Sequence, residues 1–244
     1  MRIAHAAMIA TGAASADRVY ISLFTPKECM ANHPDRETIF GKAIVEHIAV
    51  IHGVKEQQDL LEGIARAMAA ALHRGNQILW CGNGGSAGDS QHLAAEIVGR
   101  FRRERRGLPS IALTTDTSIL TSVANDYGYE AVFSRQVEAM AKPGDVLVGI
   151  STSGNSRNVV SALETARLHG VTTVAFTGEG GGRMGALADH LFAVGSRDTA
   201  RIQEAHILAG HMICDWLELD WIASQSQAEP EILSQIVSGE AGVR

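Results

Sequence analysis

Short apolar runs alternate along the middle of this chain with stretches in which apolar residues recur every three or four positions. Each run is nearly continuous and is closed by a turn rich in glycine or in serine and threonine. Such runs are typical of strands covered on both faces, and their alternation with helical stretches predicts repeated βα units. The expected strands occupy residues 77–81, 110–113, 146–150, 173–177 and 191–194. The pattern therefore predicts an α/β fold with an open, mostly parallel five-stranded sheet sandwiched by helices.

The helical periods place the remaining elements. The expected helices occupy residues 87–101, 118–124, 155–169 and 199–223, with a short turn at 183–188. Apolar residues also recur from Thr38 to Leu72, which predicts N-terminal helices, either two or one interrupted near Gly53. Residues 1–37 show no sustained period and are expected to be a tail of unknown role. The domain is thus expected at 38–223, followed by a C-terminal extension at 224–244 with one short helix around 232–237.

Composition narrows the class of protein. The 244 residues carry 27 acidic and 21 basic side chains, for a net charge of −6, and are 45% apolar. These values are typical of one globular domain, and the acidic balance argues against nucleic-acid binding. No run of eighteen apolar residues predicts a membrane span, and no signal peptide is evident. Three widely spaced cysteines form no disulfide framework, which favours a reducing, cytoplasmic location.

A glycine-rich turn, Cys81-Gly-Asn-Gly-Gly-Ser86, follows the first expected strand and opens a helix. At the carboxyl edge of a parallel sheet, free backbone N–H groups and the helix N-terminus favour an anion. Glycine lets a ligand approach the backbone, and Ser86 adds a hydroxyl. A tight turn that needs glycine only for its backbone angles explains the same sequence at least as well. The motif is neither a Walker A loop nor a GxGxxG fingerprint.

A second turn, Ser151-Thr-Ser-Gly-Asn-Ser156, follows the third expected strand and also precedes a helix. It gathers four hydroxyls in six residues, whereas capping a helix needs only one or two. A phosphate uses several donors at once, so two such loops on one sheet favour a phosphate site over plain turns. Because neither loop contains a lysine, a sugar phosphate fits better than a nucleoside triphosphate.

Two of the expected helices carry polar residues at helical spacing. His92 and Glu96 are four residues apart and project from one face, where they can bind a metal, share a proton or simply face solvent. The late helix has four polar residues in an otherwise apolar pattern: Gln203, Glu204, His206 and His211. A buried histidine with a hydrogen-bond partner is the ordinary alternative for either histidine of that helix.

Two weaker features lie between the loops. Asn125-Asp126-Tyr-Gly128 resembles a loop whose carboxylate could meet a sugar hydroxyl, although an Asx-turn explains it equally well. Residues 100–106 contain five arginines, which suit a solvated helix C-terminus. Within that run, Arg100 lies four residues after Glu96 and is the arginine expected to turn inward.

Six motifs in this order resemble the sugar isomerase (SIS) family, and specifically its phosphoheptose isomerase branch. They are Cys81-Gly-Asn-Gly-Gly-Ser86, Gln91-His92 with Glu96, Leu113-Thr-Thr-Asp-Thr-Ser118, Asn125-Asp-Tyr-Gly128, Gly149-Ile-Ser-Thr-Ser-Gly-Asn-Ser156 and Arg201-Ile-Gln-Glu204 with His211. The resemblance covers residues 38–223 and implies a flavodoxin-like SIS fold and a homotetramer with sites at subunit boundaries. It also implies conversion of sedoheptulose 7-phosphate to D-glycero-D-manno-heptose 7-phosphate, which supplies the heptose of bacterial lipopolysaccharide.

The resemblance further implies a role for individual residues. Glu96 and His211 would carry proton transfer. The residues implied to bind substrate are Asn83, Gly84, Gly85, Ser86, Glu96, Asn125, Asp126, Ser151, Thr152, Ser153, Ser156 and Gln203. One zinc ion per subunit would be held by His92, Glu96, Gln203 and His211. A carboxylate and an imidazole suit a ketose–aldose conversion, because moving a proton between C1 and C2 through an enediol needs a base at carbon and an acid or base at the oxygens.

Two points in this assignment conflict. A Glu96 carboxylate bound to metal is a poorer base, so its roles as ligand and base compete. Gln203 and His211 are eight residues apart, about 12 Å of rise in a straight helix, so sharing one ion needs a distorted helix, inclined side chains or a second subunit.

Two alternative functions and an oligomeric assembly are also considered from the sequence. A non-catalytic SIS protein resembling the replication-initiator-associating protein is the alternative to an enzyme, and the presence of Glu96 and His211 favours the enzyme. An SIS protein that senses sugar phosphates or acts on amino sugars is a third interpretation, which the lack of a helix-turn-helix or amidotransferase segment disfavours. Surplus apolar residues on the first and last helices predict a tetramer whose site combines loops of one chain with His211, or its neighbours, of another.

Overall fold

The computed structural model describes residues 38–238, and side chains as far as Gln225. The chain forms two units, residues 1–44 and 45–244; the described part of the first is residues 38–44, and the account below concerns the second. The expected tail at 1–37 lies outside the described residues. No helix among the described residues is long and apolar enough to cross a membrane.

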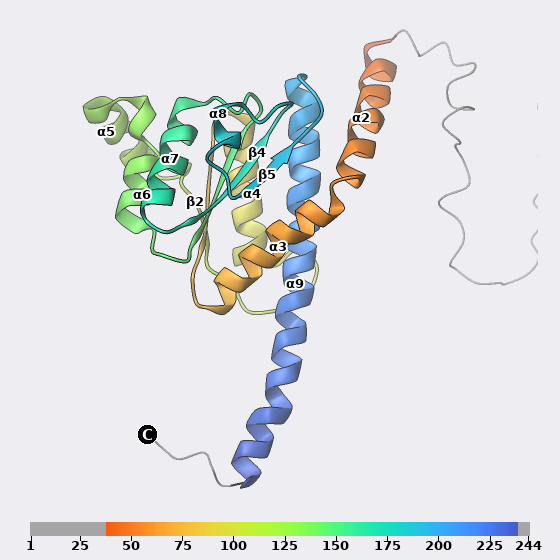
Figure 1. The fold of residues 1–244 in the computed structure, drawn as a ribbon, viewed down its shortest axis with the longest axis vertical. Helices are drawn as coiled ribbons and strands as arrows, with labels where there is room; N and C mark the ends of the chain where they lie inside the picture. Colours follow the sequence, from red (N-terminus) through yellow and green to blue (C-terminus); the bar gives the residue numbers. More distant parts are fainter. Residues whose placement is uncertain (1–37, 239–244) are drawn as a thin grey trace, which may run out of the picture. The chain divides into compact units, whose positions relative to one another are not determined.

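Five parallel strands form the sheet, as the apolar runs predict (Figure 1). The strands are β1 (Ile78–Gly82), β2 (Ser110–Ala112), β3 (Val146–Ser151), β4 (Thr172–Thr177) and β5 (His190–Ala193). Their order is β2-β1-β3-β4-β5, and every neighbouring pair is parallel. Every residue of β1 and β3 is buried, which is why these strands read as continuous apolar runs rather than alternating ones.

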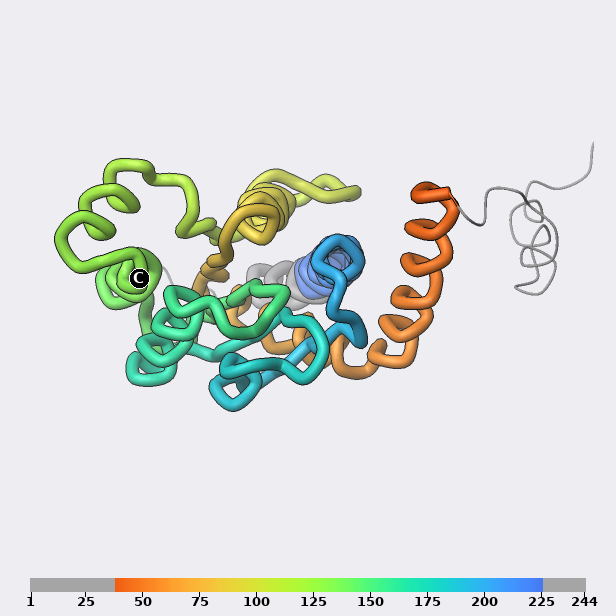
Figure 2. The backbone as a smooth tube through the Cα atoms, turned by 90° about the horizontal axis from the view of Figure 1, so that it is seen from above, coloured from red at the N-terminus to blue at the C-terminus, as the bar shows by residue number. Residues whose placement is uncertain are grey.

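Two apolar cores join helices to the two faces of this sheet. The helices of the described residues are α2 (Ile39–Lys55), α3 (Gln58–His73), α4 (Gly85–Val98), α5 (Thr117–Tyr127), the 3₁₀ turn η2 (Tyr129–Ala131), α6 (Ser134–Met140), α7 (Arg157–Leu168), α8 (Gly182–Gly185) and α9 (Thr199–Ser238). One apolar core joins α3, α4 and α9 to one face of the strands, and a second core joins α5 to α8 to the other. Figure 2, seen from above, shows α4 and α9 on one side of the strands and α7 and α8 on the other.

The structure corrects three expectations: it adds one short helix and moves two boundaries. Helix α6 was not expected, because it has seven residues and buries only Gln136 and Val137, too few to show a period. Helix α9 does not end at residue 223 but continues to Ser238, so residues 224–238 extend the same helix and form no separate short one. The Ser-Gln-Ser-Gln stretch at 224–227 is polar but contains no glycine or proline, and the helix also continues through Pro230, where the sequence predicts a stop. The N-terminal pattern is two helices, with the break at residues 56–57 rather than Gly53.

Candidate active site

The two motif loops lie side by side at the carboxyl edge of the sheet. They follow β1 and β3, which pair along their whole length with Gly82 opposite Ile150. Helix α4 leaves β1 for one face of the sheet, and α7 leaves β3 for the other. The strand order reverses between these two strands, and ligands of open α/β sheets bind at such a switch point.

The first loop is tied to its surroundings by Asn83. Gly84, the N-cap residue of α4, has a φ of +56°, so only a residue without a Cβ adopts this turn easily. The side-chain amides of Asn83 and Asn158 exchange two hydrogen bonds of 2.9 and 2.8 Å, and the Tyr129 hydroxyl donates to Asn83 Oδ1 at 3.0 Å. Asn83, predicted to bind substrate, thus holds the two loops in place, and Asn158 and Tyr129 are residues that no sequence motif pointed to.

Three hydroxyls converge in the second loop. Ser151 Oγ lies 2.8 Å from Ser156 Oγ and 3.3 Å from Ser153 Oγ. Ser151 is buried, Ser153 is exposed, and Ser156 precedes the first residue of α7. The side chain of Thr152 makes no bond within this group, and its carbonyl accepts the N–H of Gly178 at 3.0 Å. The cluster offers several hydroxyl donors beside a helix N-terminus, which suits an anion with several oxygens.

A third loop, Gly178-Glu-Gly-Gly-Gly182, packs directly against the second. The N–H of Met184 donates to the Gly154 carbonyl, and the N–H of Arg183 donates to Asn155 Oδ1, both at 3.0 Å. Gly154 has a φ of +64°, and a Cβ there would lie 2.3 Å from the Gly181 carbonyl oxygen. The glycines of the third loop are visible in the sequence, but their contact with the second loop depends on the pairing of β3 with β4.

We expect Gly154→Ala to destabilise the fold by about 1–3 kcal/mol, because alanine is strained at this φ and its methyl overlaps the third loop. The free energy of unfolding from urea titrations measures this. Gly63→Ala in α3 is the matched control: no atom lies within 4 Å of its Cβ position, so alanine should stabilise the helix by about 0.5–1 kcal/mol. Equal stability of Gly154→Ala and the parent protein would contradict the tight contact.

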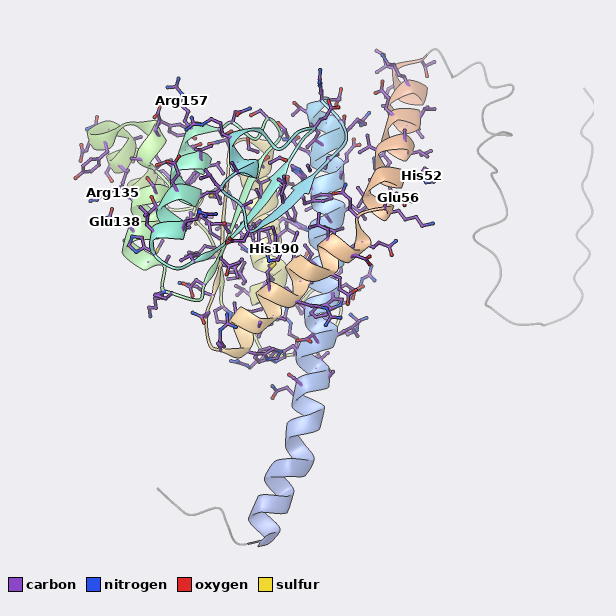
Figure 3. The ribbon with its side chains drawn as sticks, in the orientation of Figure 1. His52, Glu56, Arg135, Glu138, Arg157 and His190 are labelled. Atoms are coloured by element: carbon purple, nitrogen blue, oxygen red, sulfur yellow. The ribbon has the colours of Figure 1, made fainter. Side chains whose placement is uncertain are left out.

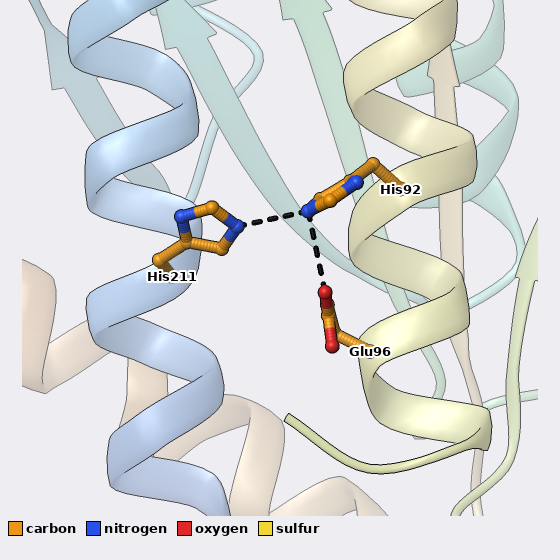
Figure 4. A group of neighbouring side chains, drawn as sticks. All are labelled: His92, Glu96 and His211. Carbon is orange, nitrogen blue, oxygen red and sulfur yellow. Dashed lines mark hydrogen bonds and ion pairs between the residues drawn. The ribbon is translucent and has the colours of Figure 1, made fainter. Parts of the chain in front are cut away.

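His92, Glu96 and His211 meet on the same side of the sheet as α4 and α9 (Figure 4). His92 Nε2 lies 2.9 Å from His211 Nε2 and 3.3 Å from Glu96 Oε1. His92 and Glu96 share one face of α4, as their spacing predicts, and His211 faces them from α9. The group forms within a single chain, so the expectation that His211 or its neighbours come from another subunit is not needed for this pair.

The donor set of this group fits a metal ion. Among the described residues, His92, Glu96 and His211 are the one group of ligand-type side chains whose donor atoms all lie within 4.8 Å of one another. Two imidazole nitrogens and one carboxylate are a common protein donor set for zinc in catalytic sites that keep an open position. Burial, followed by the charge of His92, lowers the pKa of His211 below its ordinary value, which favours the neutral imidazole that binds metals or accepts a proton.

Gln203 lies farther along the seam between α4 and α9. A Cβ on Gly85 would lie 2.4 Å from Gln203 Nε2, so this amide sits against the first loop. Helix α9 is continuous from Thr199, which places His211 about 12 Å along the axis from Gln203. The structure therefore places Gln203 beside the substrate loop, and its role as a metal ligand stays a prediction.

The remaining predicted site residues are distributed as follows. Asn125 and Asp126 are exposed in the last turn of α5 rather than in a loop, and Asn125 Nδ2 donates to Asp126 Oδ1 at 2.8 Å, so the Asx-turn interpretation is wrong. Helix α5 ends two residues before Tyr129, whose hydroxyl donates to Asn83. Arg157, labelled in Figure 3, begins α7 beside the second loop and pairs with Glu130 at 2.7 Å.

The two other polar residues of the late helix are structural. His206 is fully buried, its Nε2 donates to the Thr177 carbonyl at 3.0 Å, and burial lowers its pKa to about 4. Glu204 pairs with Arg201 and lies 2.8 Å from His47 Nδ1. His206 thus follows the ordinary pattern of a buried neutral histidine.

Asp89 is a polar residue of α4 that the sequence did not single out. It lies one turn before His92, and its Oδ2 is buried without a hydrogen-bond partner among the described residues. Burial raises the pKa of this carboxyl to about 6, against an opposing effect of His92. The group near His92 therefore contains one more carboxyl than the motifs indicated.

Comparison with known proteins gives consistent matches. The family model of the SIS domain matches residues 32–178. The phosphoheptose isomerase of Akkermansia muciniphila is 58% identical over 158 residues, 65% of this chain and 84% of that protein. That of Aliarcobacter butzleri is 56% identical over 183 residues, 75% and 97% of the two chains. The solved phosphoheptose isomerase of Neisseria gonorrhoeae has a TM-score of 0.70 and 43% identity, covering 73% of this chain and 96% of that one.

Proposed function

The chain belongs to the phosphoheptose isomerases of the SIS-domain family and is an isomerase, and from this premise we propose that it converts sedoheptulose 7-phosphate to D-glycero-D-manno-heptose 7-phosphate. A role in heptose biosynthesis accords with the same relatives, and we extend it to the heptose of lipopolysaccharide. The non-catalytic interaction protein is not favoured, because these relatives are isomerases and this chain keeps Glu96 and His211 together.

One observation carries the proposal: a hydroxyl-lined anion site and an acid–base group lie along the same two helices. Gly85 at the start of α4 adjoins the first loop, and His92 follows seven residues later, about 10 Å along the helix axis. That separation is comparable with the extended length of a seven-carbon sugar phosphate. The phosphate would occupy the loops, and C1 and C2 would reach the Glu96–His211 group.

Proton transfer then follows from the residue types. Glu96 would take the proton from the carbon beside the carbonyl and return it to the neighbouring carbon. His211, whose neutral imidazole is favoured, would move a proton between the two oxygens of the enediol. Both groups stand within reach of one small substrate, because each lies against His92.

We propose zinc as the ion that the His92–Glu96–His211 group holds, one per subunit. The support is the donor set itself, two imidazoles and a carboxylate. A zinc ion there would supply Lewis-acid polarisation of the substrate carbonyl. In such a site Glu96 can serve as base only with one oxygen left free for the substrate, and His211 can move protons only through the ring nitrogen that does not hold the ion. Gln203 would then contact the substrate from the first loop.

The phosphate assignment predicts the effect of removing one hydroxyl. We expect Ser156→Ala to weaken binding of the sugar phosphate by about 1.5–3 kcal/mol with little change in turnover, because the hydroxyl would bond a charged group remote from the reacting carbons. Competition titrations and saturation kinetics separate the two effects. Ser161→Ala on the same helix, outside the loop, is the control. Unchanged affinity in Ser156→Ala would place the phosphate elsewhere.

Incubation of the full-length protein with sedoheptulose 7-phosphate, followed by NMR, tests the function. We expect new anomeric aldose signals, and in deuterated water incorporation of deuterium at the proton-transfer carbon. A chelator should stop the reaction and added zinc should restore it. Fructose 6-phosphate is the control for chain length. If no aldose forms from the heptulose phosphate under any of these conditions, the proposed function is wrong.

We also propose a cytoplasmic homotetramer. The support is apolar surface on α4 and α9 that is exposed among the described residues, including Val98, Met212 and Leu219. Exposed apolar surface of this kind is commonly buried between subunits in closed symmetry. Analytical ultracentrifugation tests the assembly. Because Glu96 and His211 meet within one chain, mixed tetramers of Glu96→Gln and His211→Ala chains should regain no activity.

A further inference from the structure

The arginine-rich segment between α4 and β2, residues 99–109, is bound to α9 by the buried carboxylate of Glu218 and by Asp215, which pairs with Arg102 and Arg103. Glu218 on α9 is only 1% exposed. Its Oε1 accepts the N–H of Phe101 at 2.7 Å, and its Oε2 accepts the N–H groups of Arg102 and Arg103, both at 2.9 Å. Three backbone donors on one carboxylate fix the path of this segment as it leaves α4.

The positive charge nearest this carboxylate comes from Arg105, with Arg103 Nη1 farther away at 3.9 Å from Oε2, and not from Arg100. The Arg105 side chain is 3% exposed, and its Nη2 lies 3.4 Å from Glu218 Oε1. Arg100 is exposed and pairs with Glu104 at 3.7 Å, so the expectation that Arg100 turns inward is wrong. Burial alone would raise the pKa of Glu218, but the backbone hydrogen bonds and Arg105 outweigh it and lower that pKa, so the group is charged.

Two contacts connect this buried pair to the active site. The ring of Phe101 stacks on the ring of His211, with centroids 5.1 Å apart and planes 17° apart. Arg105 donates to the Glu96 carbonyl at 2.8 Å and to the Gly99 carbonyl at 2.9 Å, which satisfies carbonyls in the last turn of α4. The same segment therefore supports both the imidazole and the helical turn that carries the carboxylate.

The spacing of residues along α9 explains why Phe101 can contact both Glu218 and His211. His211 and Glu218 are seven residues apart, two turns on one face of the helix, about 10 Å in rise. Glu218 binds the backbone N–H of Phe101, and His211 contacts the ring of the same residue. The ring of His211 is thus bounded by His92 on one side and by Phe101 on another.

We propose that Glu218 is a positioning residue for the isomerase: through Phe101 and Arg105 it fixes the His211 ring and the Glu96 turn in the arrangement that proton transfer requires. The inference rests on the proposed function. Small displacements of acid–base groups lower turnover strongly, whereas the loops that would bind the phosphate lie at the other end of α4. Losing the anchor should therefore reduce kcat far more than it raises KM.

Three variants separate the anchor from general stability. Glu218→Gln keeps the shape but turns an amide NH₂ toward at least one of the three backbone N–H donors. Phe101→Leu leaves the carboxylate and its backbone bonds in place and removes only the ring that stacks on His211. Glu104→Gln makes the same carboxylate-to-amide change at an exposed position of the same segment and is the matched control.

The measurement that does not depend on catalysis is NMR of the full-length protein labelled with ¹³C in its histidine rings. The His211 signal is assigned as the one lost in His211→Gln. Loss of the stacked phenyl ring should shift this signal downfield in Phe101→Leu and, in the same direction, in Glu218→Gln, but not in Glu104→Gln. In the same proteins we expect kcat to fall about tenfold or more in the first two variants, with KM changed less than threefold.

These experiments distinguish a failure of the positioning role from a failure of the proposed function. If Glu218→Gln fails to fold, Phe101→Leu still tests the contact with His211. A His211 signal unmoved in Phe101→Leu, or wild-type kcat in that variant, would overturn the positioning role. If the parent protein does not isomerise the heptulose phosphate, the proposed function fails, while the NMR shifts still decide whether this segment orders the His211 ring.

Discussion

Replacing Glu96 with glutamine should lower turnover by about 10²- to 10⁴-fold while leaving the fold and sugar-phosphate binding in place, because the amide keeps the side-chain shape but accepts no proton. The carboxylate is partly buried and lies 3.3 Å from His92 on the same face of α4. Turnover is measured by NMR of the heptulose phosphate, and binding by competition titration.

Glu138→Gln provides the comparison for that experiment. Glu138, labelled in Figure 3, is an exposed carboxylate on α6 that pairs with Arg135 at 2.8 Å, on the other face of the sheet from Glu96. It should keep parent turnover. Near-parent turnover in Glu96→Gln as well would leave Glu96 a structural residue and assign the base to another group.

Removing the central imidazole should have its largest effect on metal affinity. In His92→Ala we expect zinc affinity to fall about 100-fold or more, since even partners outside the ligand shell typically contribute 10–100-fold. His92 Nε2 is the atom that both Glu96 and His211 approach. Competition with a chromophoric chelator measures this affinity without any substrate.

His73→Ala controls for the loss of an exposed histidine. His73 Nε2 lies 2.7 Å from Asp220 Oδ2, so α3 and α9 also form a histidine–carboxylate pair, but among the described residues no third ligand-type side chain completes it. Parent zinc affinity is expected in this variant. A His92→Ala protein that holds zinc as tightly as the parent would place the metal elsewhere.

Periodicity and continuity of the apolar residues predicted the sheet well. The third strand was expected at 146–150 and runs Val146–Ser151, because a strand buried on both faces shows no polar interruption. Short α6 was not foreseen because it has too few buried residues. The C-terminal part of α9 was not foreseen because the polar residues from Ser224 and the proline at Pro230 indicate the end of a helix, which the structure nevertheless continues. The sequence predicted whether an element is a helix or a strand wherever burial imposes a pattern. It did not predict where these helices begin and end.

Local spacing also predicted part of the site. His92 and Glu96 share a helix face by their sequence separation alone, and the hydroxyl cluster of the second loop is contiguous. Asn158, Tyr129 and Arg105 could not be found this way, because each acts on a residue 9 to 75 positions away through the packing of separate elements. The resemblance to a family supplied His211, which spacing left as an ordinary buried histidine.

The alignment of α4 with α9 limits which changes of length this chain can tolerate. The contacts between the two helices pair residues at matching positions along both: Gln203 with Gly85, Gly210 with Leu93, His211 with His92, and Glu218 with Phe101 just after α4. The helices therefore run parallel, and the difference in residue number between partners stays nearly constant. One residue inserted in either helix would rotate all following side chains by about 100° and advance them by about 1.5 Å. Insertions and deletions should therefore be absent from both helices among active homologues, while single substitutions on their outer faces accumulate freely.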